Sequence, residues 1–95
     1  MPAYLIADIE VTDPEGYEEY KRRVPAIIAA HGGRYLARGG AVEVLEGTWR
    51  PKRNAIIEFA DLASFRAFWD SPEYQPLREL RERAAKSNLV VVEGL

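Results

Sequence analysis

Two pairs of adjacent glycines, Gly32-Gly33 and Gly39-Gly40, stand on either side of residues 34–38 and constrain the fold more than any other feature of the sequence. Glycine adopts positive φ angles without steric cost, so such pairs are typical of a helix that stops sharply and of a strand that bends or turns. The segment between the pairs predicts a short strand that carries Arg34 and Arg38 on one face. No catalytic signature of similar specificity occurs elsewhere.

Strand-like and helix-like patterns alternate along the first third of the chain. Residues 4–11 predict a strand, because apolar side chains recur at every second position. Pro14 begins a predicted helix that ends at Gly32, since the missing N–H of proline costs nothing in the first turn. Pro25 removes a hydrogen bond to the carbonyl of Lys21, so we expect a bend in this helix rather than its end.

The remaining segments complete a simple alternation of elements. Gly39-Gly40 is expected to be either a β-bulge or a tight turn between residues 34–38 and the next extended piece. The later elements follow in this order: an extended piece over 41–46, a loop over 47–53, a strand over 54–59, a helix after Asp61 that breaks at Ser71-Pro72, a second helical start at Pro76, and a strand over 89–93.

The order strand, helix, strand, strand, helix, strand predicts an α+β fold of the ferredoxin-like, split βαββαβ kind. Its four antiparallel strands would have the helices on one face. All 95 residues form one predicted domain, 1–95, and so small a domain buries only about 60 to 65% of its unfolded surface. Tyr4 and Ile6 lie on the other side of the first strand, and the last strand is apolar on both sides, so something must cover the second face. We therefore expect a homodimer in which two sheets pack together and leave a cavity between sheet and helices.

Composition excludes several classes of function. The chain has no cysteine, which rules out disulfides and thiolate metal sites and indicates a reducing compartment. No apolar run reaches the roughly 18 residues that span a bilayer, so we expect a cytoplasmic protein with no membrane partner. A formal charge of −2 is the wrong sign for a nucleic-acid-binding domain. One histidine without cysteine gives no ligand set, so we expect no metal and no cofactor.

Several short motifs occur together and in a fixed order: Thr12-Asp13-Pro14, His31-Gly32-Gly33-Arg34-Tyr35-Leu36, Arg38-Gly39-Gly40, Glu46-Gly47, Arg53 and Ser71-Pro72-Glu73-Tyr74. Over essentially the whole chain they resemble domain of unknown function 1330. The resemblance implies a dimeric α+β barrel, a wider group that includes cofactor-free monooxygenases, lactone isomerases, haem-dependent enzymes and plain ligand-binding modules. It therefore implies a fold without an activity.

Three residues are candidates for proton transfer. His31 is the only imidazole in the chain, although its place before Gly32 is equally that of a residue that caps the preceding helix. Asp8 and Glu58 fall on predicted strands, where one of them could be a desolvated base with a raised pKa. Solvated strand edges are the alternative for these carboxylates.

Four residues are candidates for ligand binding. Arg38 and Arg53 stand at the ends of apolar strands, where a guanidinium can hold a carboxylate or an enolate. The alternative is that they are solvated or pair with acidic side chains, namely Glu46, Glu58 or Asp8. Trp69 and Tyr74 flank the helix break and predict the rim of a pocket, or else ordinary core aromatics.

Two main hypotheses about function follow from these residues. The first is a homodimer that binds a small anionic or aromatic organic molecule between sheet and helices. The second is a cofactor-independent enzyme, of monooxygenase or isomerase type, in which the proton-transfer candidates act and an arginine stabilises an enolate. A third is that side chains fill the cavity and the dimer serves another partner. An apolar pocket with arginines favours binding, whereas a residue of strongly shifted pKa beside a bound carbonyl favours the enzyme.

Overall fold

Four antiparallel strands form a single sheet in the order β2-β3-β1-β4, as a computed structural model of residues 1–95 shows. In chain order the elements are β1 (Ala3–Val11), α1 (Pro14–Ala30), β2 (Arg34–Arg38), β3 (Asn54–Phe59), α2 (Leu62–Trp69), α3 (Tyr74–Ala84) and β4 (Ala85–Glu93). This is the predicted split βαββαβ arrangement, with the second helix broken into α2 and α3. No helix is long and apolar enough to cross a membrane.

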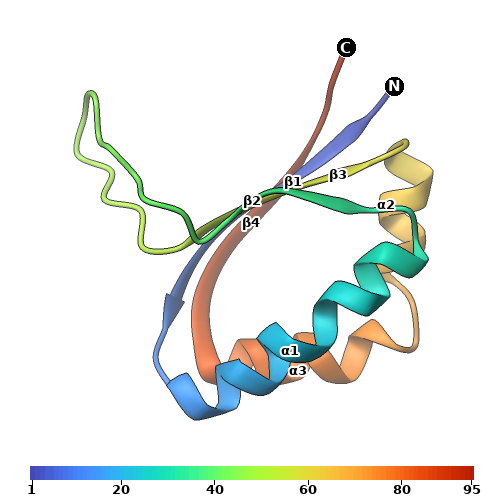
Figure 1. Cartoon of the computed structure of the whole chain (residues 1–95), viewed down its shortest axis with the longest axis horizontal. Helices are drawn as coiled ribbons and strands as arrows, with labels where there is room; N and C mark the ends of the chain where they lie inside the picture. Colours follow the sequence, from blue (N-terminus) through green and yellow to red (C-terminus); the bar gives the residue numbers. More distant parts are fainter.

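All three helices lie on one side of the sheet, and the core lies between the two layers (Figure 1). Alternation places every second residue of β1 and β3 in this core, so that Leu5, Ala7 and Ile57 are buried. Phe59 and Phe68 are fully buried beside them, with ring centroids 5.4 Å apart. The side of β1 predicted to be buried is therefore confirmed.

The helix boundaries follow local capping. α1 begins at Pro14 as predicted and continues through Pro25 to Ala30. The helix after Asp61 begins at Leu62, where the Asp61 side chain accepts a hydrogen bond from the Ser64 amide at 2.7 Å. α3 begins at Tyr74, two residues before the predicted start at Pro76.

β2 contains a bulge that reverses one of the sequence predictions. Arg34 lies opposite Glu58, whereas Arg38 lies opposite Ala55, and the register shifts by one residue between Tyr35 and Ala37. An extra residue in one strand changes which face the following side chains occupy. Arg34 therefore lies on the open face, where it pairs with Glu58, and Arg38 lies on the helix-facing side with Ala55. The prediction that both arginines share one face is wrong.

The segment between β2 and β3, residues 39–52, is here called the arm. Residues 41–46 were predicted as an extended piece of sheet, but they form no strand, and Gly39-Gly40 is neither a bulge nor a tight turn. Instead β2 ends at Arg38. The next residue, Gly39, has a φ of +69° and its amide donates a hydrogen bond to the Asn54 carbonyl, and the chain leaves the sheet from there. The arm then projects away from the body of the protein, in green at the left of Figure 1.

The face of the sheet opposite the helices has no covering layer of its own. Val90 and Val92 on β4 are 61% and 49% exposed, and Leu36 at the bulge is 50% exposed. The arm adds further exposed apolar side chains, including Leu45 and Trp49. Large apolar residues gathered in this way are typical of surfaces that bind another protein.

Candidate functional site

A narrow cavity lies between the sheet and α1, and most of its lining is apolar. β1, β3 and α1 supply aliphatic side chains, and aromatic rings complete the lining: Tyr17, Tyr20, Tyr35, Phe68 and Tyr74. Lys21, Arg38 and Arg53 are its only charged lining residues. About 30 Å³ is accessible to water, within a hollow of about 470 Å³ that includes the open mouth. As it stands the cavity holds one or two water molecules, so a larger occupant requires the mouth to open.

A missing backbone donor in α1 fixes the position of Arg38. Pro25 has no N–H, so the carbonyl of Lys21, four residues earlier, receives no helical hydrogen bond from it. The Arg38 guanidinium donates to that carbonyl at 2.6 Å and lies over the Tyr35 ring at 4.8 Å. The proline in α1 and the bulge in β2 together place Arg38 at the cavity mouth.

Arg53 enters the same mouth from the start of β3. Its guanidinium lies 5.9 Å from the centre of the Tyr17 ring and packs against Gly39, where an added Cβ would come within 2.5 Å of Nη1. Neither Arg53 nor Arg38 forms an ion pair. The alternative that they pair with Glu46, Glu58 or Asp8 is therefore not what the structure contains. Two guanidinium groups without a carboxylate partner thus lie at the apolar mouth of the cavity.

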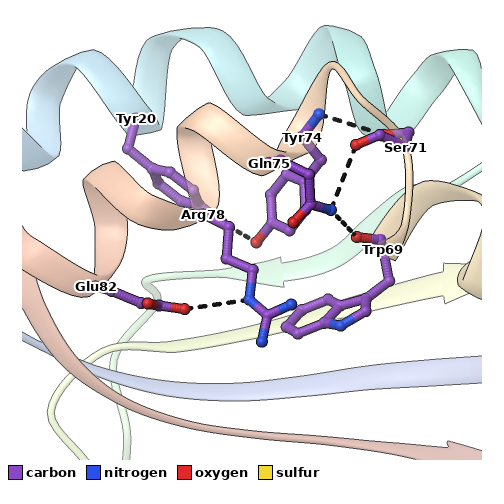
Figure 2. Close-up of polar contacts among 7 residues, drawn as sticks. All are labelled: Tyr20, Trp69, Ser71, Tyr74, Gln75, Arg78 and Glu82. Atoms are coloured by element: carbon purple, nitrogen blue, oxygen red, sulfur yellow. Dashed lines mark hydrogen bonds and ion pairs between the residues drawn. The ribbon is translucent and has the colours of Figure 1, made fainter.

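Two phenol groups meet deeper in the cavity. The hydroxyl groups of Tyr20 and Tyr74 are 3.0 Å apart, and both side chains are buried (Figure 2). Burial raises the pKa of Tyr20 far above its ordinary value, because the phenolate would lose its hydration. Tyr20 is therefore a neutral group at physiological pH, able to donate or accept one hydrogen bond.

The turn between α2 and α3 holds Tyr74 in place. The Ser71 hydroxyl donates to the Phe68 carbonyl at 2.8 Å and accepts from the Tyr74 amide at 3.3 Å. Gln75 donates to the Trp69 carbonyl at 2.8 Å, which closes the same turn (Figure 2). These bonds give Ser71 a structural role like that of a helix cap, as its position in the sequence predicted.

Trp69 does not line this cavity. Its ring stacks on Phe65 with centroids 5.9 Å apart and lies under the guanidinium of Arg78 at 4.3 Å, on the outer side of Tyr74 (Figure 2). Of the four ligand-binding candidates, the structure thus brings Arg38, Arg53 and Tyr74 together and leaves Trp69 behind Tyr74.

His31 also lies outside the cavity. Its Nδ1 is 2.9 Å from the Ile27 carbonyl, to which it donates, and its ring meets the edge of Phe68. The residue thus occupies the C-cap position of α1, the alternative that its place before Gly32 offered.

Asp8 and Glu58 point to the open face of the sheet, away from the cavity. Asp8 accepts hydrogen bonds from the Lys52 amide at 2.9 Å and the Trp49 indole at 3.1 Å, and the first of these is the main cause of its lowered pKa. Glu58 pairs with Arg34 at 2.7 Å, which lowers its pKa as well. The expectation of a raised pKa is wrong for both, because hydrogen-bond donors hold each carboxylate in its charged form.

Sequence reasoning did not identify Tyr20, or Arg81 on α3, as residues of interest. Tyr20 lies on the buried face of α1, among side chains spaced as in an ordinary apolar core. Its hydroxyl was the available signal, since a buried phenol requires a partner. Arg81 is only 4% exposed, and its position was the available signal, since it lies four residues after Leu77 and three before Ala84 on the buried face of α3. No group of three or more His, Asp or Glu side chains is placed to hold a metal ion.

Comparison with known proteins identifies the family. The family called Domain of unknown function (DUF1330) matches residues 2–95. The chain belongs to DUF1330. No curated protein matches this DUF1330 chain.

Solved structures similar to this DUF1330 protein share its fold. A protein of unknown function from Rhodopseudomonas palustris has a TM-score of 0.80 at 20% identity, covering 99% of this chain and 82% of that one. SnoaB, a cofactor-independent oxygenase from Streptomyces nogalater, has a TM-score of 0.69 at 16% identity, covering 99% and 93%. A dimeric ferredoxin-like protein of unknown function from Thermobifida fusca has a TM-score of 0.68 at 19% identity, covering 99% and 92%. At these identities the likeness establishes the ferredoxin-like fold alone.

Proposed function

We propose that this DUF1330 protein is a cytoplasmic homodimer that binds a small organic anion in the cavity between sheet and helices. The carboxylate of the ligand lies between Arg38 and Arg53, and its apolar or aromatic part extends along the tyrosine-lined interior. The observation that carries the proposal is the pair of guanidinium groups at an apolar mouth with no acidic partner.

The small free volume implies that binding and opening occur together. Arg53 is half-buried and forms no ion pair, so its side chain is able to turn outward toward a ligand while Arg38 keeps its bond to the Lys21 carbonyl. When it does so, its place in the hollow of about 470 Å³ becomes available to an aromatic ring. Ring stacking on Tyr17 then replaces the present contact of the Arg53 guanidinium.

The alternative, a cofactor-independent enzyme like SnoaB, has weaker support in this chain. All three proton-transfer candidates lie outside the cavity, and both carboxylates among them have lowered pKa values. The polar side chains that line the cavity are phenols and cations. Such a lining favours recognition of an anion over abstraction of a proton.

The homodimer is supported by the uncovered sheet face and by the relatives. Structures with the same fold include dimeric proteins, such as the one from Thermobifida fusca. A second copy packed on the open face would cover Val90, Val92 and Ile6.

Titration with benzoate, followed by NMR amide shifts, tests the proposed site. Arg53→Ala is expected to weaken benzoate binding about tenfold, because a charge-assisted bond is lost, while stability stays within about 1 kcal/mol of wild type. Arg50→Ala is the matched control, since Arg50 bonds only to carbonyls within the arm. Equal binding by all three proteins, or no binding by wild type, would contradict the proposed site.

A further inference from the structure

Arg81 is a buried cation that is not among the residues proposed to bind the anion. Its side chain projects from α3, is only 4% exposed and has no carboxylate within ion-pair distance. Its Nε is buried and makes no hydrogen bond. Burying a donor without a hydrogen-bond partner is costly, so the Nε of Arg81 calls for an explanation.

The neighbours of Arg81 are the two phenols at the inner end of the cavity. Its guanidinium lies 5.9 Å from the centre of the Tyr20 ring. Burial opposes its charge, yet the oxygen atoms of Tyr74 and Tyr20 raise the pKa of Arg81, so it stays charged. A positive charge behind a phenol pair strengthens hydrogen-bond donation from that pair toward the cavity.

A second buried polar group without a partner lies on the same side of the molecule. The Oγ of Ser87 on β4 makes no hydrogen bond. Ser87 lies directly opposite Ile9, and Ile9 and Leu89 both line the cavity. The chain's only two buried side-chain polar atoms without partners thus belong to α3 and β4 beside this one cavity. Native proteins leave few such atoms, and those that occur call for a partner.

From these contacts we infer that the inner end of the cavity, formed by Tyr20 and Tyr74 with Arg81 behind them, is a second polar subsite that takes an oxygen of the ligand. This inference rests on the proposed function and makes the ligand class more specific. The ligand is a carboxylate with a second oxygen, a hydroxyl or keto group, at the far end of a short aromatic or apolar skeleton. Its carboxylate meets the arginines at the mouth, and its second oxygen accepts a hydrogen bond from the phenol pair.

Two probes that differ by one oxygen test this inference. In NMR titrations of the full chain, 4-hydroxybenzoate is expected to bind about tenfold more tightly than benzoate, because the added oxygen gains a hydrogen bond to a polarised donor. Tyr74→Phe should remove this preference, so that the variant binds the two probes with equal affinity. Tyr17→Phe is the matched control, since it makes the same change in the same cavity at the mouth, where Arg53 covers the ring.

The outcomes separate this inference from the proposed function. If both probes bind equally well and Arg53→Ala weakens both, the anion site stands and the inner subsite is wrong. If Tyr17→Phe removes the preference and Tyr74→Phe does not, the second oxygen binds elsewhere, which also overturns the inference. If neither probe binds, the proposed function fails, and the subsite fails with it.

The contribution of Arg81 has its own signature. Because a cation near a phenol favours the phenolate, the phenol of bound 4-hydroxybenzoate should ionise at lower pH in wild type than in Arg81→Met, as its ultraviolet absorption reports. Arg81→Lys keeps the charge and should restore much of the effect, provided that the variant folds by circular dichroism. An unchanged phenol pKa in folded Arg81→Met would show that Arg81 has only a structural role.

Discussion

At the scale of single residues, the position of Arg38 at the cavity mouth depends on the missing backbone N–H of Pro25. Pro25 lacks the N–H that would bond to the Lys21 carbonyl, and Arg38 uses that carbonyl at 2.6 Å. The loss of this helical bond was readable from the sequence, since it follows from proline chemistry. The identity of the replacement donor was not, because it comes from a strand that only the fold brings next to α1.

Replacing this proline tests the connection. Pro25→Ala restores the helical N–H, so the helix should be no less stable than in wild type, while Arg38 loses its exclusive acceptor. We expect a melting temperature equal to or higher than that of wild type, and benzoate binding weaker by about threefold because the guanidinium is less well positioned. A large fall in stability would instead mean that the Pro25 ring makes packing contacts that alanine cannot replace. Ala26→Gly, at an exposed position one residue later, is a control for helix stability alone.

At the scale of elements, β2 and the arm differ from what the sequence pattern predicted. Alternation predicted Arg34 and Arg38 on one face, and the bulge at Leu36 separated them. Bulges leave little trace in hydrophobic periodicity, because a strand of only five residues is too short for one extra residue to disturb the alternation visibly. Residues 41–46 have strand-like composition, but the arm leaves the sheet at Gly39 and so has no neighbouring strand to pair with.

The two glycines after β2 should differ sharply in their tolerance to substitution. Gly39→Ala imposes a side chain at φ +69° and places Cβ within 2.5 Å of Arg53 Nη1, so it should weaken benzoate binding and lower stability by about 1 kcal/mol. Gly40→Ala meets no atom within 4 Å and should change neither quantity. Benzoate titration and urea unfolding of the two variants compare them. Equal effects would show that Gly39 does not position Arg53.

The attachment of the arm to β1 should depend on pH. Hydrogen bonds from Lys52 and Trp49 favour the charged form of Asp8 and lower its pKa below 3.8. The arm is therefore fully attached to β1 above pH 3.8, and the attachment is lost as the pH falls through the lowered pKa of Asp8. NMR resonances of the Trp49 indole and the Lys52 amide should move together with a midpoint below pH 3.8. A midpoint above pH 3.8 would contradict the lowered pKa of Asp8. As a control, Asp8→Asn should abolish the transition.

At the scale of the whole molecule, the order of elements along the chain, the single helical layer and the uncovered sheet face were all predictable from the sequence. Alternation in β1 and β3, the capping residue Asp61 and the helix-starting Pro14 are local signals, and they agree with the global fold. The candidate site was only partly predictable. Arg38, Arg53 and Tyr74 stood out as polar residues near breaks, but the phenol pair and Arg81 become significant only when α1 and α3 pack together.

Self-association is the prediction that belongs to this scale. Val90→Lys places a charge in the middle of the open face, so it should shift the protein from dimer toward monomer in sedimentation velocity experiments. Ala29→Lys adds the same charge on the exposed outer side of α1 and should leave the dimer intact. A wild-type monomer at micromolar concentration, or a Val90→Lys dimer of unchanged affinity, would contradict the proposed assembly.

The arm begins directly after Arg38 and ends directly before Arg53, and one backbone bond, from the Gly39 amide to the Asn54 carbonyl at 2.7 Å, closes its base. The bonds from Lys52 and Trp49 to Asp8 hold the arm to the open side of β1 as well. The two arginines of the cavity mouth are thus the residues at which the chain leaves the sheet for an arm of exposed apolar side chains and then returns to it.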